Sequence, residues 1–115
     1  MLKKIEAIIR EDKLNDVKDA LHEVGIRGMN VFEIRGQGRQ GGITLAGRSG
    51  TYQVDMLPKM QINIILSEDN VDETIAAILK GGRTGDAGDG LIFVYPVDEA
   101  VMYPGDIDER KKGAA

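Results

Sequence analysis

The segment TGDAGDGLIFVYP, residues 84–96, places three glycines and two aspartates directly before a strongly apolar run. A glycine-rich turn between a helix and a strand can present successive backbone N–H groups to a phosphate. The same pattern is typical of a turn that only reverses the chain, in which aspartates bind the neighbouring backbone. The segment is therefore a candidate anion site, and other parts of the chain must decide between the two interpretations.

Composition narrows the class of protein. A chain of 115 residues can bury the core of one domain. It contains no cysteine, which excludes a disulfide framework, a thiol nucleophile and a thiolate metal site and favours a cytoplasmic location. The net charge of -4 argues against nucleic acid as a partner. No apolar run approaches the roughly 20 residues that a membrane span needs.

Apolar periodicity indicates the order strand, helix, strand, which occurs twice. The expected strands are 3–10, 28–36, 56–66 and 91–97, and the expected helices are 12–25 and 70–82. Two such units predict an α+β fold, a ferredoxin-like βαββαβ sandwich with a four-stranded antiparallel sheet and both helices on one face. The last two expected strands are apolar enough that their second face needs a cover, so we expect a homo-oligomer.

A long glycine-rich segment separates the second expected strand from the third. Residues 36–52 contain six glycines and no sustained apolar period. We expect a loop that is mobile without ligand, because its glycines leave few side chains to hold it in place. A loop of this length in so small a domain is usually functional.

Three segments together closely resemble the P-II family of signal-transduction proteins. They are IEAIIREDKLNDVKDALHEVGIRGMNVFEIRGQGRQGG, VDMLPK and GGRTGDAGDGLIFV, and the resemblance covers residues 3–97. It implies a domain at 1–97 with a T-loop at about 37–53 and a B-loop at about 82–90, followed by a C-loop and polar tail at 98–115. It further implies a homotrimer with nucleotide sites in the clefts between subunits.

The resemblance also implies a function. Members of the family are non-enzymatic allosteric regulators that bind ATP, ADP or AMP, with 2-oxoglutarate held beside magnesium. Their T-loop docks on a membrane transporter or a metabolic enzyme, most often in nitrogen metabolism. By resemblance, we expect the same of this chain, with no catalytic residue and no metal site built from the chain alone.

The family's site residues carry over to matching positions. The expected nucleotide-binding residues are Gly28, Met29, Asn30, Gly36, Gly38, Arg39, Gln40, Gly88, Asp89 and Gly90. Gln40 and Lys59 match the contacts to 2-oxoglutarate, and Tyr52 matches a position that some members modify by uridylylation.

Three positions depart from the family pattern. Leu91, Met102 and Pro104 stand where the family has a lysine and two arginines that reach the phosphates. A site with fewer cations gains less from a third phosphate, so we expect ADP or AMP to bind at least as tightly as ATP. Possible substitute cations are Arg39, Arg83 and Arg110.

Two alternatives remain at this point. One is a specialised P-II-like sensor that favours ADP or AMP, responds to another anion such as bicarbonate, and is linked to bicarbonate or metal transport. The other is a small ferredoxin-like phosphatase. A phosphatase needs a nucleophile or general base in the glycine-rich cleft, and the chain offers there neither cysteine nor its single histidine, His22, which lies on the charged side of the first expected helix.

Overall fold

The computed structural model describes residues 1–36, 43–47, 50–54 and 56–103, with the backbone alone for 43–47 and 50–54. Its elements are β1 (Leu2–Arg10), η1 (Glu11–Lys13), α1 (Leu14–Glu23), β2 (Asn30–Gly36), β3 (Ile43–Gly47), β4 (Gly50–Val54), β5 (Leu57–Ser67), η2 (Glu68–Asn70), α2 (Val71–Gly82) and β6 (Gly90–Val97). Among the described residues, no helix is both long and apolar enough to cross a membrane.

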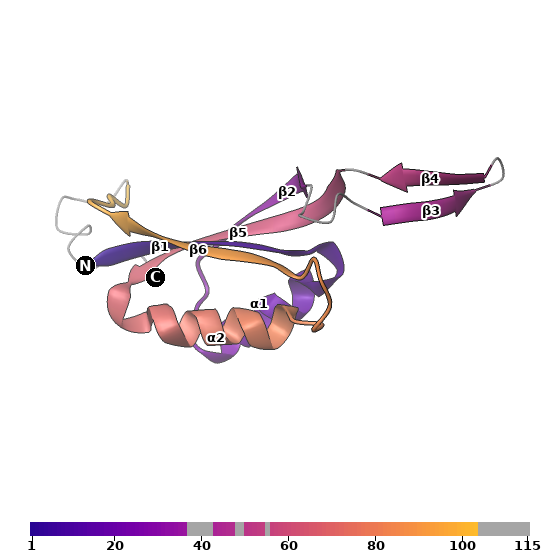
Figure 1. Ribbon diagram of the computed structural model, residues 1–115. Helices are drawn as coiled ribbons and strands as arrows, with labels where there is room; N and C mark the ends of the chain where they lie inside the picture. Colours follow the sequence, from indigo (N-terminus) through magenta and orange to yellow (C-terminus); the bar gives the residue numbers. More distant parts are fainter. Residues whose placement is uncertain (37–42, 48–49, 55, 104–115) are drawn as a thin grey trace.

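Four strands form one antiparallel sheet in the order β2-β5-β1-β6. Both helices lie on one face of this sheet (Figure 1). This arrangement confirms the predicted ferredoxin-like sandwich. Strand β1 is central, because it pairs with β5 on one side and with β6 on the other, and it therefore links the two halves of the sheet.

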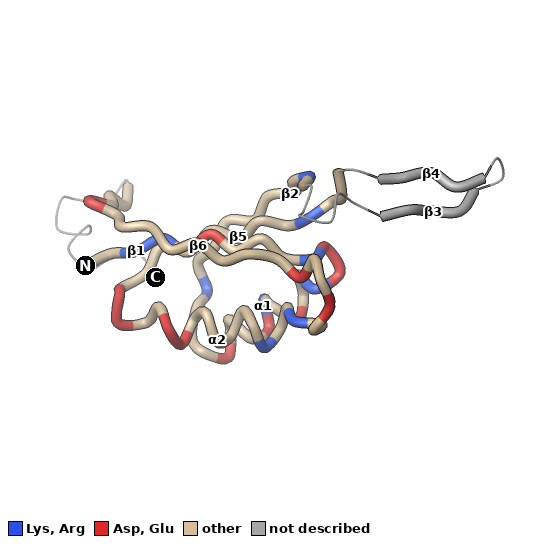
Figure 2. Tube along the Cα trace, in the orientation of Figure 1, with Lys and Arg blue, Asp and Glu red and all other residues tan. Residues whose placement is uncertain are grey.

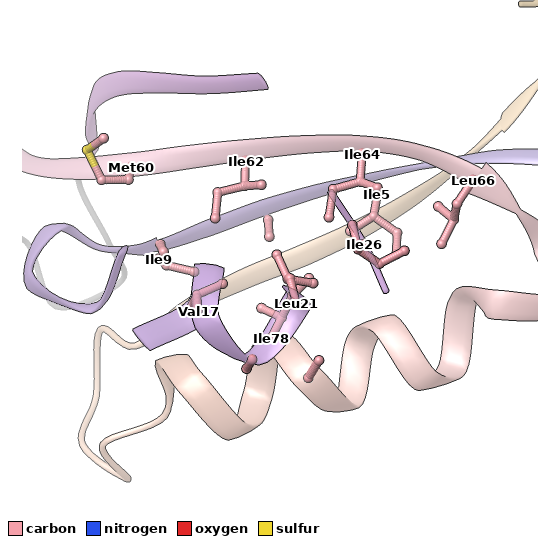
Figure 3. Packing of buried hydrophobic residues seen from close by; sticks show 13 residues of the cluster. Ile5, Ile9, Val17, Leu21, Ile26, Met60, Ile62, Ile64, Leu66 and Ile78 are labelled. Carbon is pink, nitrogen blue, oxygen red and sulfur yellow. The ribbon is translucent and has the colours of Figure 1, made fainter. Parts of the chain in front are cut away.

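The helices are amphipathic. Charged residues recur along both helices (Figure 2), whereas Val17, Leu21 and Ile78 point toward the sheet and are buried (Figure 3). Gly81 marks the close approach of the two helices, because a Cβ there would lie 2.7 Å from the carbonyl oxygen of Asp16. Only glycine allows α2 to approach the backbone of α1 so closely.

The core lies between the helices and the sheet (Figure 3). Every second residue of β1 is buried there, namely Ile5, Ala7 and Ile9, as the two-residue period of a strand requires. From β5 come Met60, Ile62, Ile64 and Leu66. Burial of each large aliphatic side chain contributes on the order of 1.5–3 kcal/mol, so this layer accounts for much of the stability.

Within the described part of the chain, the opposite face of the sheet carries no helix (Figure 1). Its apolar exposure comes from the two edge strands, with Leu91, Phe93 and Tyr95 on β6 and Phe32 on β2. The central strands contribute polar residues to this face, including Glu6 of β1 and its partner Asn63 on β5. The exposed apolar face that we expected is therefore present on β6 but not on β5, which places Lys59, Gln61 and Asn63 on this side of the sheet.

Within the expected loop, residues 43–47 and 50–54 form two strands that the apolar period did not indicate. There β3 and β4 pair as an antiparallel hairpin, from Ile43 opposite Val54 to Gly47 opposite Gly50. The hairpin projects beyond the ends of β2 and β5, away from both helices (Figure 1). Each strand has only five residues, which is too few for a clear apolar period. The neighbouring glycines are typical of a loop and outweighed the β-forming residues between them.

Candidate functional site

The candidate anion loop lies where three elements meet at one end of the sheet. Strand pairing places Arg10, the last residue of β1, opposite Lys59 of β5. The neighbouring Ile9 lies opposite Gly90, the first residue of β6. Residues 83–89, which connect α2 to β6, therefore lie beside two cationic side chains. Figure 2 shows basic and acidic residues gathered at this end of the molecule.

Both cationic side chains hold carbonyl groups of the loop. The Arg10 Nη2 group donates a hydrogen bond of 2.8 Å to the carbonyl oxygen of Ala87. The Lys59 Nζ group donates one of 2.6 Å to the carbonyl oxygen of Gly88. Because these carbonyls are bound from the sheet side, the loop is tethered to the ends of both β1 and β5.

Asp89 forms the centre of the loop. Its Oδ2 atom accepts hydrogen bonds of 2.9 Å from the backbone N–H groups of Thr84 and Gly85. Its Oδ1 atom accepts from the Thr84 hydroxyl and, over 2.9 Å, from Arg10 Nε. The hydrogen bond from the Thr84 hydroxyl, then the bond from Arg10 and the backbone bonds, hold the pKa of Asp89 well below its usual range. The carboxylate therefore stays charged.

Lys59 lies in a different electrostatic environment. Burial lowers the pKa of its ammonium group, and the nearby charge of Arg10 lowers it further, while Asp89 and Asp12 act in the opposite direction. Two neighbouring cations that repel each other gain energy when an anion binds between them. This end of the sheet is thus suited to a carboxylate or a phosphate.

Two glycines of the loop are required by geometry. Gly88 has φ +90, and a Cβ there would lie 3.6 Å from Arg10 Nη2 and 4.0 Å from Lys59 Nζ. Gly90 has φ +142, and a Cβ there would lie 1.8 Å from the carbonyl oxygen of Ile8. Side chains at these positions would strain the backbone and, at Gly90, collide with β1.

The expected nucleotide-binding residues do not form one cluster within a single chain. Gly88 and Gly90 lie beside the edge strand β6, whereas Asn30 begins the opposite edge strand, β2, directly after Gly28 and Met29. Two central strands separate these edges, which places them roughly 14 Å apart at the usual strand spacing. Gly36 ends β2 opposite Leu57, on the same end of the sheet as the loop.

Several expected residues fall outside what the structure describes. Gly38, Arg39, Gln40 and Pro104 lie outside the described residues, and for Tyr52 only the backbone, within β4, is described. The other two departures from the family pattern are exposed. Leu91 is 61% exposed and Met102 is 52% exposed.

Two residues of the site were missed by sequence reasoning. Arg10 was interpreted as the end of a strand, and Thr84 as part of a turn. A signal for Arg10 existed, because the last residue of the central strand in a ferredoxin-like order lies beside the connection that enters the edge strand. Among the described residues, no group of three or more potential metal ligands is gathered anywhere.

A groove of about 280 Å³ lies next to the loop on the helix side. Its lining is chiefly apolar, with Ile9, Ile78, Leu79 and Ile92 among the residues. Arg83, Asp89 and Gly90 also line this groove, so it adjoins the candidate anion loop, although a chiefly apolar lining does not itself favour phosphate.

Comparison with known proteins adds independent findings. A family model described as "Nitrogen regulatory protein P-II" matches residues 2–104. The "Nitrogen regulatory protein P-II 2" of Methanothermobacter thermautotrophicus is 49% identical over 100 residues, 87% of each chain. The "Nitrogen regulatory protein P-II" of Azospirillum brasilense is 51% identical over 100 residues, 87% of this chain and 89% of the relative. A crystal structure of Arabidopsis thaliana PII bound to citrate superposes with a TM-score of 0.71 at 32% identity, covering 89% of this chain and 80% of that chain.

The charge of Asp89 generates a prediction about stability and pH. Because the folded pKa of Asp89 lies below its unfolded value, its carboxylate stabilises the fold above about pH 4, and this contribution is lost as the pH falls through the folded pKa. We expect Asp89→Asn to unfold at a lower urea concentration than the parent at pH 7, and the two midpoints to converge toward pH 2.

The matched control is Asp86→Asn, which removes the same charge from the same loop. Among the described residues, the Asp86 carboxylate makes no hydrogen bond; only its backbone N–H donates, to the Thr84 hydroxyl. Its midpoint at pH 7 should stay near that of the parent. If the urea midpoints of Asp89→Asn and the parent differ by the same amount at pH 7 and at pH 2, the assigned role of the charge is wrong.

Proposed function

Since the chain belongs to the P-II family of nitrogen regulatory proteins, we propose that it binds adenine nucleotides through the B-loop and passes this signal to a partner through the T-loop. The family consists of non-enzymatic regulators, and the chain is a nitrogen regulatory signalling protein. We place it in the cytoplasm, which agrees with its lack of cysteine. The regulated partner is a membrane transporter or a metabolic enzyme.

One observation carries the proposal of nucleotide binding. The B-loop is a preformed glycine turn in which Arg10 and Lys59 bind the carbonyls of Ala87 and Gly88. Among the described residues, the N–H groups of Ala87 and Gly88 donate no hydrogen bond, so they are available to an anion. Such a turn at the edge of a sheet favours phosphate in the way that helix N-termini and backbone nests do. The residues at the start of β2 would then contact the adenine and the ribose.

A homotrimer would bring the two halves of the site together. Within one chain, the B-loop and Asn30 lie beside opposite edges of the sheet, so a nucleotide that touches both needs two copies. The exposed Leu91, Phe93 and Phe32 give the helix-free face an apolar surface to bury. We therefore place three nucleotide sites in the clefts between three subunits.

A small carboxylate is the proposed second effector. Arg10 and Lys59 supply two neighbouring cations at the end of the sheet, and the Arabidopsis relative is bound to citrate. 2-oxoglutarate is the effector that fits a magnesium ion held by ATP phosphates, with Gln40 and Lys59 as its protein contacts. The hairpin of β3 and β4 would carry the response outward, because it projects away from the body (Figure 1).

The chain is also proposed to be an atypical member. Leu91 is exposed where the family has a lysine, and Met102 is exposed where it has an arginine. Neither side chain can neutralise a phosphate. We infer that discrimination between ATP, ADP and AMP is reduced, while binding through backbone N–H groups persists.

The first prediction of this function concerns assembly. Light scattering at micromolar concentration should give three times the chain mass of 12.5 kDa, because the sheet edges and the helix-free face are buried in the trimer. The mass should be the same with and without ADP. A monomer at this concentration would contradict the placement of the nucleotide sites between subunits.

The second prediction concerns nucleotide preference. In calorimetric titrations with magnesium, ATP should bind no more tightly than ADP or AMP, and 2-oxoglutarate should add little to ATP affinity. Leu91→Lys should restore a preference for ATP of about tenfold or more, since a charge-assisted hydrogen bond contributes roughly 1.5–3 kcal/mol. Leu91→Met, which adds no charge, is the matched control.

A parent protein that already prefers ATP by tenfold, about 1.4 kcal/mol, would contradict the atypical assignment. A Leu91→Lys variant that gains no more for ATP than Leu91→Met would show that position 91 does not face the phosphates.

A further inference from the structure

We propose that Asp89 is a positioning residue that shapes the B-loop for phosphate without touching the nucleotide. This inference rests on the proposed nucleotide binding and assigns the Asp89 carboxylate a role within it. The carboxylate is directed into the loop, where both of its oxygens already accept hydrogen bonds. It has little capacity left for a ligand, and its negative charge would repel a phosphate.

The bonds to Asp89 decide which backbone groups of the loop remain available. The N–H groups of Thr84 and Gly85 are committed to Asp89 Oδ2. The hydrogen bonds of the described residues include none from the N–H groups of Ala87 and Gly88. Because Asp89 binds the N–H groups of Thr84 and Gly85, it leaves the N–H groups of Ala87 and Gly88 available to a ligand.

Asp89 also orients the guanidinium group of Arg10. It binds Arg10 through Nε over 2.9 Å, which leaves Nη2 to reach the carbonyl oxygen of Ala87. The same Nη2 atom lies 3.6 Å from the position that a Cβ on Gly88 would occupy. The Arg10 guanidinium is thus held beside the turn that would receive a phosphate, and it compensates in part for the cations missing at 91 and 102.

Two contacts tie this arrangement to the rest of the fold. Thr84 uses its hydroxyl both to donate to Asp89 and to accept from the N–H group of Asp86, so it links both halves of the loop. Lys59 holds the carbonyl oxygen of Gly88 from β5. Within the loop, the carboxylate of Asp89 accepts four hydrogen bonds, from Arg10, Thr84 and Gly85, and is the acceptor with the most contacts there.

The experiment compares Asp89→Asn with Asp86→Asn in calorimetric titrations of the full chain with ADP. Both changes remove one negative charge from the same loop, so simple electrostatics predicts equal or tighter binding of the anionic nucleotide for both. A positioning role predicts the opposite sign for Asp89→Asn. We expect its Kd to rise at least about tenfold, a change of about 1.4 kcal/mol, and that of Asp86→Asn to change by less than about threefold.

A second readout follows the loop without nucleotide. Amide hydrogen exchange at Thr84 and Gly85, measured by NMR, should accelerate in Asp89→Asn and stay unchanged in Asp86→Asn. If Asp89→Asn fails to fold, the hydroxyl of Thr84 provides the same test. Thr84→Val should weaken ADP binding, and Thr84→Ser, which keeps the hydroxyl, should retain it.

The outcomes separate this inference from the function on which it rests. If the parent binds ADP and Asp89→Asn binds it equally or more tightly, Asp89 has no positioning role and the proposed function stands. If the parent binds none of ADP, ATP or AMP, both are wrong. Weaker binding by Asp89→Asn with unchanged exchange at Thr84 and Gly85 would overturn the positioning role and indicate direct contact with the ligand.

Discussion

The structure depends on the antiparallel pairing of β1 with both β5 and β6. This pairing buries one side of β1 in the core. It brings the end of β1 beside the start of β5 and the start of β6, so that Arg10, Lys59 and the B-loop meet at one end of the sheet. The contact between Arg10 and Asp89 joins residues 79 positions apart in the chain. The order of strands in the sheet therefore assembles the candidate site from three segments of the chain that are distant in sequence.

The same strand order separates the B-loop from the start of β2, although the proposed nucleotide site needs both. With β2 and β6 at opposite edges of the sheet, the B-loop and the start of β2 lie beside edges roughly 14 Å apart in one chain. The helix-free face is apolar near those edges and polar in the middle. Assembly of several copies resolves both problems, because it covers the exposed edges and creates composite clefts. Ligand binding between subunits then couples the copies, which is the physical basis for an allosteric response.

Most of the fold could be predicted from the sequence, because alternating burial in β1 and β5 and the helical period in α1 and α2 are local signals. The hairpin of β3 and β4 was missed because its strands have only five residues each and are bounded by glycines. The glycine loop was identified from its composition, including the interpretation that its aspartates bind neighbouring backbone, and Asp89 does so. Arg10 was missed because its partner lies far away in the chain, although the expected strand order places the end of the central strand beside the loop.

The central claim is that outward-facing N–H groups of the B-loop hold a phosphate in a cleft completed by the start of β2 from another copy. The direct measurement is a map of backbone amide chemical shifts during titration of the uniformly labelled protein with ADP. We expect the largest changes at Ala87 and Gly88, together with changes at Gly28, Met29 and Asn30. Shifts confined to α1 and to Ile78 and Leu79 of α2, with the B-loop unchanged at saturation, would contradict the account.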